Sequence, residues 1–166
     1  MTILIKNGRL INPSENLDKV MDIFVEDGII KEKAESIEKQ ADTVIDAAGC
    51  YVMPGLIDLH VHFRDPGLTY KEDIETGSKA AAKGGFTTVC CMPNTKPVVD
   101  NVETVKYIIE KGKKVGLTNV LPVGAVTKNM AGVEITDVEE LKKAGICAIS
   151  EDGKSVMNSG VYRKAM

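Results

Sequence analysis

The sequence lacks the features that mark several large classes of protein. Its 21 basic and 24 acidic residues are interspersed without a basic patch, which argues against a nucleic-acid or anionic-membrane partner. A charge at Lys6 interrupts the first residues before a signal-peptide core is built, and no uncharged run is long and apolar enough to span a bilayer. We therefore expect a cytoplasmic protein with no nucleic-acid or membrane partner.

Several site motifs are also missing. The four cysteines show no CxxC spacing, which fits free thiols in a reducing compartment. There is no solenoid repeat, low-complexity segment or glycine-rich phosphate loop, and no histidine after His62. With 43% hydrophobic residues, the 166-residue chain can still build a folded core.

The residues best suited to form a functional site lie in the stretch from 55 to 67, GLIDLHVHFRDPG, which holds both histidines. Side chains alternate along a strand, so Leu56, Asp58, His60 and His62 are predicted on one face and the intervening apolar residues on the other. A carboxylate and two imidazoles on a buried face need partners, and imidazole pairs often find a metal. The alternative is that both histidines line a half-exposed sheet face and only form hydrogen bonds.

A tight turn follows this strand directly. Arg64 and Asp65 precede Pro66-Gly67, a dipeptide typical of turns. The turn holds a guanidinium beside the predicted metal clamp, and this arrangement suits an anionic substrate.

The first 52 residues predict a small β module of short antiparallel strands. Asn7-Gly8 and Asp27-Gly28 each lie between apolar runs and favour type I′ hairpins. Strand-like pieces follow at 43–46 and 51–53. The charged connection from Lys31 to Gln40 is predicted to be a solvated surface segment.

From 53 to 166 the pattern alternates between strands and helices, which predicts βαβ units and a parallel sheet. Predicted strands cover 55–62, 86–92, 120–126 and 146–150. Predicted helix starts are Thr69, Asp100 and Thr136, predicted stops are Gly84, Gly112 and Gly145, and Asn158 and Ser159 are cap candidates for a fourth helix.

The length of this second part fits about half of a TIM barrel. A closed (β/α)₈ barrel needs roughly 250 residues, and those after Val52 suffice for between three and four strand–helix units. We expect an α/β chain whose (β/α)₈ barrel is incomplete, a fragment of a longer protein. The alternative is a small open α/β sheet that is complete in itself.

The chain resembles the amidohydrolase superfamily and, within it, the bacterial dihydroorotases. The resemblance rests on three runs: PGLIDLHVHFRDPG at 54–67, GGFTTV at 84–89 and MPNT at 92–95. The amino-terminal hairpins resemble the small β-sandwich domain of that family, so the similarity covers essentially the whole chain. The implied fold is a small β-sandwich domain over 1–52 followed by the first half of a (β/α)₈ TIM barrel.

The resemblance implies a zinc site with one or two ions. His60 and His62 would ligate one zinc, while Arg64 and Asn94 would bind a substrate carboxylate. Many relatives have a carboxylated lysine at the end of the fourth strand, where this chain has Asp152 as the matching metal ligand. Ordinary turns remain the alternative for Asn94 after Pro93 and for Asp152-Gly153. Lys154 lies past the glycine and is expected to point away from the site.

The implied reaction is the reversible zinc-dependent cyclisation of N-carbamoyl-L-aspartate to L-dihydroorotate in pyrimidine biosynthesis. The family's further histidine ligands and its general acid/base aspartate come from later strands, so no catalytic residue is assigned here and the chain alone is expected to be inactive. A hydantoinase or allantoinase is the alternative enzyme, and Arg64 favours the carboxylate-bearing substrate. The alternative outside the enzyme class is a non-catalytic protein that binds aspartate transcarbamoylase. The expected partners are the small-molecule substrate, a second copy of the chain in a homodimer, or aspartate transcarbamoylase.

Overall fold

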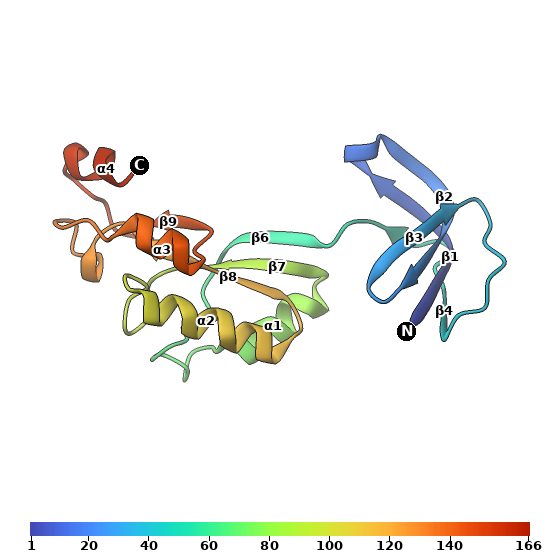
Figure 1. The fold of residues 1–166 in the computed structure, drawn as a ribbon, viewed down its shortest axis with the longest axis horizontal. Coiled ribbons are helices and arrows are strands. Elements are labelled where there is room, and N and C mark those ends of the chain that lie inside the picture. Colours follow the sequence, from blue (N-terminus) through green and yellow to red (C-terminus); the bar gives the residue numbers. More distant parts are fainter. The chain divides into compact units, whose positions relative to one another are not determined.

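The structure is a computed structural model that describes residues 1–166. The chain divides into two compact units, Met1–Pro54 and Gly55–Met166, each of which is described by itself. Figure 1 shows the strands of the first unit from blue to teal and the helices and strands of the second from cyan to red. No helix has both the length and the apolar character needed to cross a membrane.

The first unit is a five-stranded mixed sheet in the order β3-β2-β1-β4, with β5 also paired to β1. Its strands are β1 (Thr2–Asn12), β2 (Leu17–Glu26), β3 (Ile29–Ala34), β4 (Thr43–Asp46) and β5 (Tyr51–Val52), with a 3₁₀ turn, η1, at Pro13–Glu15. The Asp27-Gly28 hairpin is confirmed, because both residues have positive φ and join the antiparallel pair β2 and β3. Strands β4 and β5 run parallel to β1, so the expectation of antiparallel strands was wrong for these two.

The prediction of a hairpin at Asn7-Gly8 was wrong. These residues form a bulge inside β1, where the register with β2 shifts between Ile5 and Gly8. Asn7 adopts φ 64° and its N–H donates to Asp22 Oδ1 at 2.9 Å. A Cβ on Gly8 would lie 2.5 Å from Val52 Cγ2, so a glycine at this position permits the close packing of Val52. An asparagine–glycine pair can serve a bulge as well as a turn, and local sequence does not distinguish them.

The segment from Lys31 to Gln40 is less solvated than predicted. Its first four residues belong to β3, and Ile37 is only 2% exposed. Ile37 packs with Leu4 and Phe24 in the core of this unit. A single apolar residue among charges carries no periodicity, so the sequence pattern missed it.

The second unit confirms the predicted parallel half barrel. Its four strands pair in parallel, in the order β6-β7-β8-β9. They are β6 (Leu56–Val61), β7 (Phe86–Cys91), β8 (Asn119–Ala125) and β9 (Ala148–Ser150). The helices are α1 (Ile74–Lys83), α2 (Val102–Val115), α3 (Val138–Ala144) and α4 (Ser159–Ala165), with a 3₁₀ turn, η2, at Lys128–Met130. Asn158 caps α4, as the sequence predicted.

The helix limits differ from prediction at two places. Helix α1 begins at Ile74 rather than after Thr69, because Asp73 is the N-cap and forms a capping box with Thr76. Helix α2 continues through Gly112 and ends at Gly116, which has φ 68°. A Cβ on Gly112 would lie 2.7 Å from Val120 Cβ, so this glycine permits close packing of α2 on β8 instead of stopping the helix. The starts of α2 and α3 lie one residue later than predicted, at caps Asn101 and Asp137.

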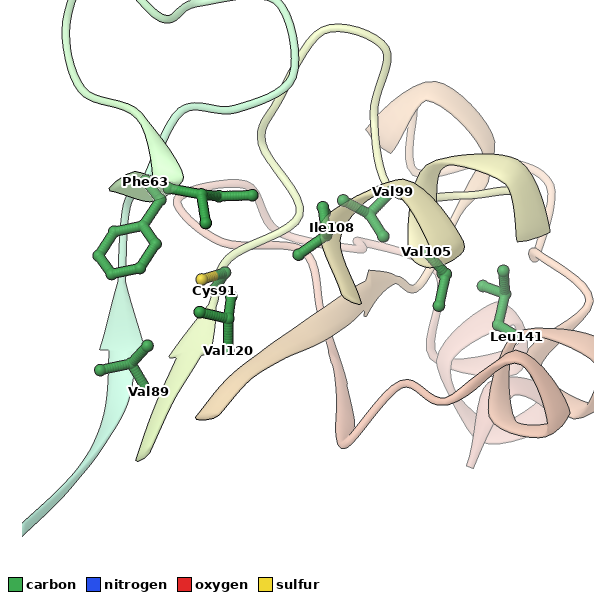
Figure 2. Close-up of a cluster of buried hydrophobic side chains, with 9 residues drawn as sticks. Phe63, Val89, Cys91, Val99, Val105, Ile108, Val120 and Leu141 are labelled. Carbon is green, nitrogen blue, oxygen red and sulfur yellow. The ribbon is translucent and has the colours of Figure 1, made fainter. Parts of the chain in front are cut away.

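A core between the sheet and its helices holds the second unit together, and Figure 2 shows most of its side chains. Val89, Val99 and Val105 in this cluster are completely buried. Burying a side chain of this size contributes roughly 1.5–3 kcal/mol. Alternate residues of β7 face opposite sides of the sheet: Val89 and Cys91 join this core, while Cys90 and Met92 join a second cluster. Both faces of the sheet are therefore apolar at β7, as expected for an inner strand of a parallel sheet, whereas Ile57 and Leu59 on the edge strand β6 are exposed.

Candidate metal centre

The end of β6 places His60 and His62 side by side. Their Nε2 atoms lie 3.3 Å apart, so both imidazoles share one side of the strand as predicted. The predicted alternation of side chains along the strand does not extend back to Asp58. Three residue steps of β6, from Asp58 to Val61, match two steps of β7, which is a bulge in β6. The Asp58 carboxylate does not join the two imidazoles, and its Oδ1 instead accepts the backbone N–H of His60 at 3.0 Å, so the prediction that all three side chains act on one face was wrong for this residue.

Asp152 joins the two histidines from the far side of the sheet, with β7 and β8 lying between its strand and theirs. It follows β9, at the same carboxyl end of the parallel sheet at which β6 presents its histidines. One ligand atom from each of His60, His62 and Asp152 lies within 4.8 Å of the others. Asp152 Oδ1 is 3.1 Å from His60 Nε2, and Asp152 Oδ2 is 3.8 Å from His62 Nδ1. The three side chains that the sequence predicted as metal ligands are thus brought together.

The spacing of these atoms suits a zinc ion. Zinc–nitrogen bonds of about 2.0–2.1 Å at a tetrahedral angle place two nitrogen ligands roughly 3.3–3.4 Å apart. The observed Nε2–Nε2 distance of 3.3 Å agrees with this value. The donor set of two imidazoles and a carboxylate is also one that zinc accepts. The residues present therefore fit the metal that the resemblance implies.

Asn94, just beyond β7, connects two of these side chains. Its Oδ1 lies 3.1 Å from His62 Nδ1, and its Nδ2 donates to Asp152 Oδ2. An amide oxygen can only accept, so a hydrogen bond here requires the proton on His62 Nδ1. In the neutral imidazole, Nε2 then keeps its lone pair for a metal. Asn94 is thus placed at the site, where it contacts side chains of the ligand group.

A buried carboxylate holds the loop that carries Asp152. Glu151 is 6% exposed, and its Oε2 accepts hydrogen bonds from the backbone N–H of Val126 at 3.0 Å and of Thr127 at 3.1 Å. Thr127 Oγ1 also donates to Glu151 Oε1. These bonds join the carboxyl end of β9 to that of β8. Lys154 donates to Met130 O at 3.1 Å and is turned away from the ligand group, as expected.

The turn after the histidines holds Arg64 and Asp65 in different environments. Arg64 is half-buried and has φ 55°. Asp65, not Arg64, forms the ion pair of this turn, with Lys111 Nζ at 2.6 Å. The sequence interpretation gave no role to Asp65 or Glu151. The only available signal was that each acidic residue adjoins a candidate site residue at a strand end.

Solved structures identify the class of this half barrel. The L-hydantoinase of Arthrobacter aurescens matches with a TM-score of 0.78 and 26% identity over 98% of this chain and 37% of its own. A D-hydantoinase matches with a TM-score of 0.68 and 30% identity over 97% of this chain and 36% of its own. The fold is that of the amidohydrolase TIM barrels to which these enzymes belong.

Relatives with similar sequences specify the family within this class of enzymes. Dihydroorotases of Pelobacter propionicus, Ruminiclostridium cellulolyticum and Geobacter sulfurreducens are 50%, 53% and 53% identical over the whole of this chain. The chain spans 39% of the length of each of them. Residues 49–166 match the family model described as dihydro-orotase-like, and the chain belongs to that family.

Proposed function

We propose that the full-length protein containing this chain is a zinc-dependent dihydroorotase that interconverts N-carbamoyl-L-aspartate and L-dihydroorotate in the cytoplasm, in pyrimidine biosynthesis. The observation that carries the proposal is the convergence of His60, His62 and Asp152 at the carboxyl end of the sheet. TIM-barrel enzymes place their active sites at this end. Dihydroorotase is also the printed name of the relatives that are about half identical to this chain.

The proposed roles of the ligand group concern metal binding. His60, His62 and Asp152 would hold zinc, with Asp152 in the position from which it could bridge a second ion. When bound, zinc lowers the pKa of its water and polarises the amide carbonyl of the ring. The buried loop contacts of Glu151 keep Asp152 at the strand end. The proton-transferring aspartate and the remaining ligands would come from outside these residues.

Arg64 and Asn94 would bind the substrate carboxylate. The guanidinium of Arg64 presents parallel N–H donors that match a carboxylate. The Asn94 amide carries two N–H groups, of which one donates to Asp152, so the second can serve a substrate. This assignment agrees with the contacts that Asn94 makes inside the site.

The alternative within the class is a hydantoinase, since hydantoinases share the fold at 26–30% identity. Arg64 favours the dihydroorotase because a hydantoin ring without a carboxylate does not need it. The test is to measure kcat/KM of the zinc-loaded full-length protein for L-dihydroorotate and for an uncharged hydantoin. Preference for dihydroorotate that is lost in Arg64→Ala supports the proposal. Preference for the uncharged ring overturns it, and so does a protein without turnover of either substrate, which would favour the non-catalytic partner of a transcarbamoylase.

A further inference from the structure

The Asp65 carboxylate is buried beside the candidate site, and the proposed reaction gives it no part. Its side chain has no exposed surface, and Lys111 Nζ lies 2.6 Å from its Oδ2. Tyr107, also on α2, donates its hydroxyl to Asp65 Oδ1 at 2.9 Å. The N–H of Ile74, the first residue of α1, donates to Oδ2 at 3.3 Å. A buried carboxylate is stable only when it is paired and hydrogen-bonded, so these contacts tie the turn after β6 to two helices.

The same turn is also fixed against the loop after β7. The N–H of Lys96 donates to Pro66 O at 3.1 Å. Gly67 has φ +88°, and a Cβ there would lie 1.7 Å from Lys96 O. Lys96 is two residues beyond Asn94, so the loops that carry Arg64 and Asn94 are joined through their backbones. The turn has contacts on both sides and little freedom to shift.

Arg64 lies at the start of this turn, one residue before Asp65. Its φ of 55° is in the left-handed region, which residues other than glycine adopt rarely. Such a backbone conformation persists where surrounding contacts fix it. The hydrogen bond and ion pair with Asp65 also raise the pKa of Lys111, which keeps its ammonium charged at neutral pH. The direction of the Arg64 side chain therefore depends on the anchoring of its neighbour.

We propose that Asp65, Lys111 and Tyr107 are positioning residues that hold Arg64 in place to bind the substrate carboxylate. The inference rests on the proposed function and deepens it. Lys111 and Tyr107 lie on the outer helix α2 and would act only through the turn. Removing the Lys111 ammonium frees the turn to shift, and a displacement of about 1 Å of a substrate-binding group can cost on the order of 10²-fold in rate.

The test compares Lys111→Met with Lys106→Met in the zinc-loaded full-length protein. Lys106 is an exposed residue on the same helix and pairs with no carboxylate, so it is the matched control. We expect Lys111→Met to lower kcat/KM for dihydroorotate about 10²-fold, mainly through KM, with unchanged zinc content. Lys106→Met should match the wild type, and Lys111→Arg should restore most of the loss. In an Arg64→Ala background, Lys111→Met should cause no further loss.

Each contrary result has a distinct meaning. Equal kcat/KM in Lys111→Met and Lys106→Met overturns the inference, and so does an equal loss with and without Arg64, which would show a general structural role. Tyr107→Phe removes a single hydroxyl and provides the same non-additivity test if Lys111→Met does not fold. A wild-type protein that does not turn over dihydroorotate overturns the proposed function and this inference with it, whereas an active wild type with unaffected variants overturns the inference alone.

Discussion

The Nδ1 atom of His62 lies 3.1 Å from the Oδ1 atom of Asn94, and this contact sets which nitrogen of the imidazole can bind a metal. The other end of the same amide donates to Asp152. One side chain from the loop after β7 therefore orients two candidate ligands from different strands. Hydrogen bonds of this kind around metal ligands typically affect metal affinity by 10–100-fold.

Asn94→Ala should therefore weaken zinc binding by about 10–100-fold, because both orienting hydrogen bonds are lost. Competition with a chelating dye on the full-length protein measures this affinity. Asn119→Ala is the matched control, since Asn119 lies at the opposite, amino end of β8 and donates to Thr88. Zinc affinity in Asn94→Ala equal to that of the control would mean that the amide does not orient the ligands.

Replacing a candidate ligand should lower the amount of zinc bound. His60→Ala, His62→Ala and Asp152→Asn each remove or neutralise one donor of the group, while the fold should change little because none of them belongs to the apolar core. Zinc per protein chain, measured by elemental analysis, checks this outcome. Glu139→Gln should bind as much zinc as the wild type, because Glu139 is exposed on α3 and pairs with Lys143. An unchanged zinc stoichiometry in both histidine variants would show that His60 and His62 do not bind the zinc.

Arg64→Lys should weaken carboxylate recognition while keeping the charge. Lysine lacks the planar fork of parallel donors, so we expect a loss of about 1.5–3 kcal/mol in transition-state binding, seen as lower kcat/KM for dihydroorotate. Arg163→Lys, on the exposed face of α4, is the control. Steady-state kinetics that show no difference between the two variants would remove the substrate role of Arg64.

Gly112→Ala should destabilise the protein although alanine is the better helix former. The gain in helix propensity is about 1 kcal/mol. The added methyl group would lie 2.7 Å from Val120 Cβ, and overpacking of this kind costs about 1–3 kcal/mol. Urea unfolding measures the difference, with Lys106→Ala on the same helix as a control that should not lose stability. A stabilised Gly112→Ala protein would show that α2 can move away from β8 at little cost.

The charge of Asp73 should make the stability of α1 depend on pH. The Asp73 pKa is lowered from its usual 3.8, first because the carboxylate accepts a hydrogen bond from the Thr76 N–H, at 2.8 Å. A lowered pKa contributes stability that is present above pH 3.8 and is lost as the pH falls through the folded value. Asparagine caps helices about as well but has no charge.

Asp73→Asn should therefore be less stable than the wild type at pH 7 by about 0.3–1 kcal/mol, the usual value of a charge at a helix N-terminus. The difference should shrink toward zero in strong acid, where Asp73 is protonated. Urea unfolding of both proteins across this pH range measures it. A difference that is independent of pH would show that the charge of Asp73 does not act on the helix.

Local sequence determined much of this fold. The alternation of apolar runs with helical segments after Pro54 predicted the parallel sheet, because strand and helix periodicities are properties of short segments. Asp27-Gly28 predicted its hairpin for the same reason, since both residues accept positive φ. The spacing of His60 and His62 placed both imidazoles on one side of a strand without reference to any other part of the chain.

Tertiary contacts decided the rest. Asn7-Gly8 forms a bulge instead of a hairpin turn because the Asp22 carboxylate accepts the N–H of Asn7. Val52 packs against Gly8 and leaves no room for a Cβ there. Gly112 stayed within α2 because β8 lies against it. These outcomes depend on residues far away in the sequence, which no local pattern contains.

The site itself shows the same division. The sequence supplied the residue types, His60, His62, Asn94 and Asp152, through motifs and a family resemblance. The sheet order supplied their distances, because strands that are distant in sequence end at one edge and bring Asp152 to within 3.1 Å of His60. The burial of Asp65 could be decided only by packing, because its partners, Lys111 and Tyr107, lie about forty residues later on a helix whose docking depends on the completed sheet.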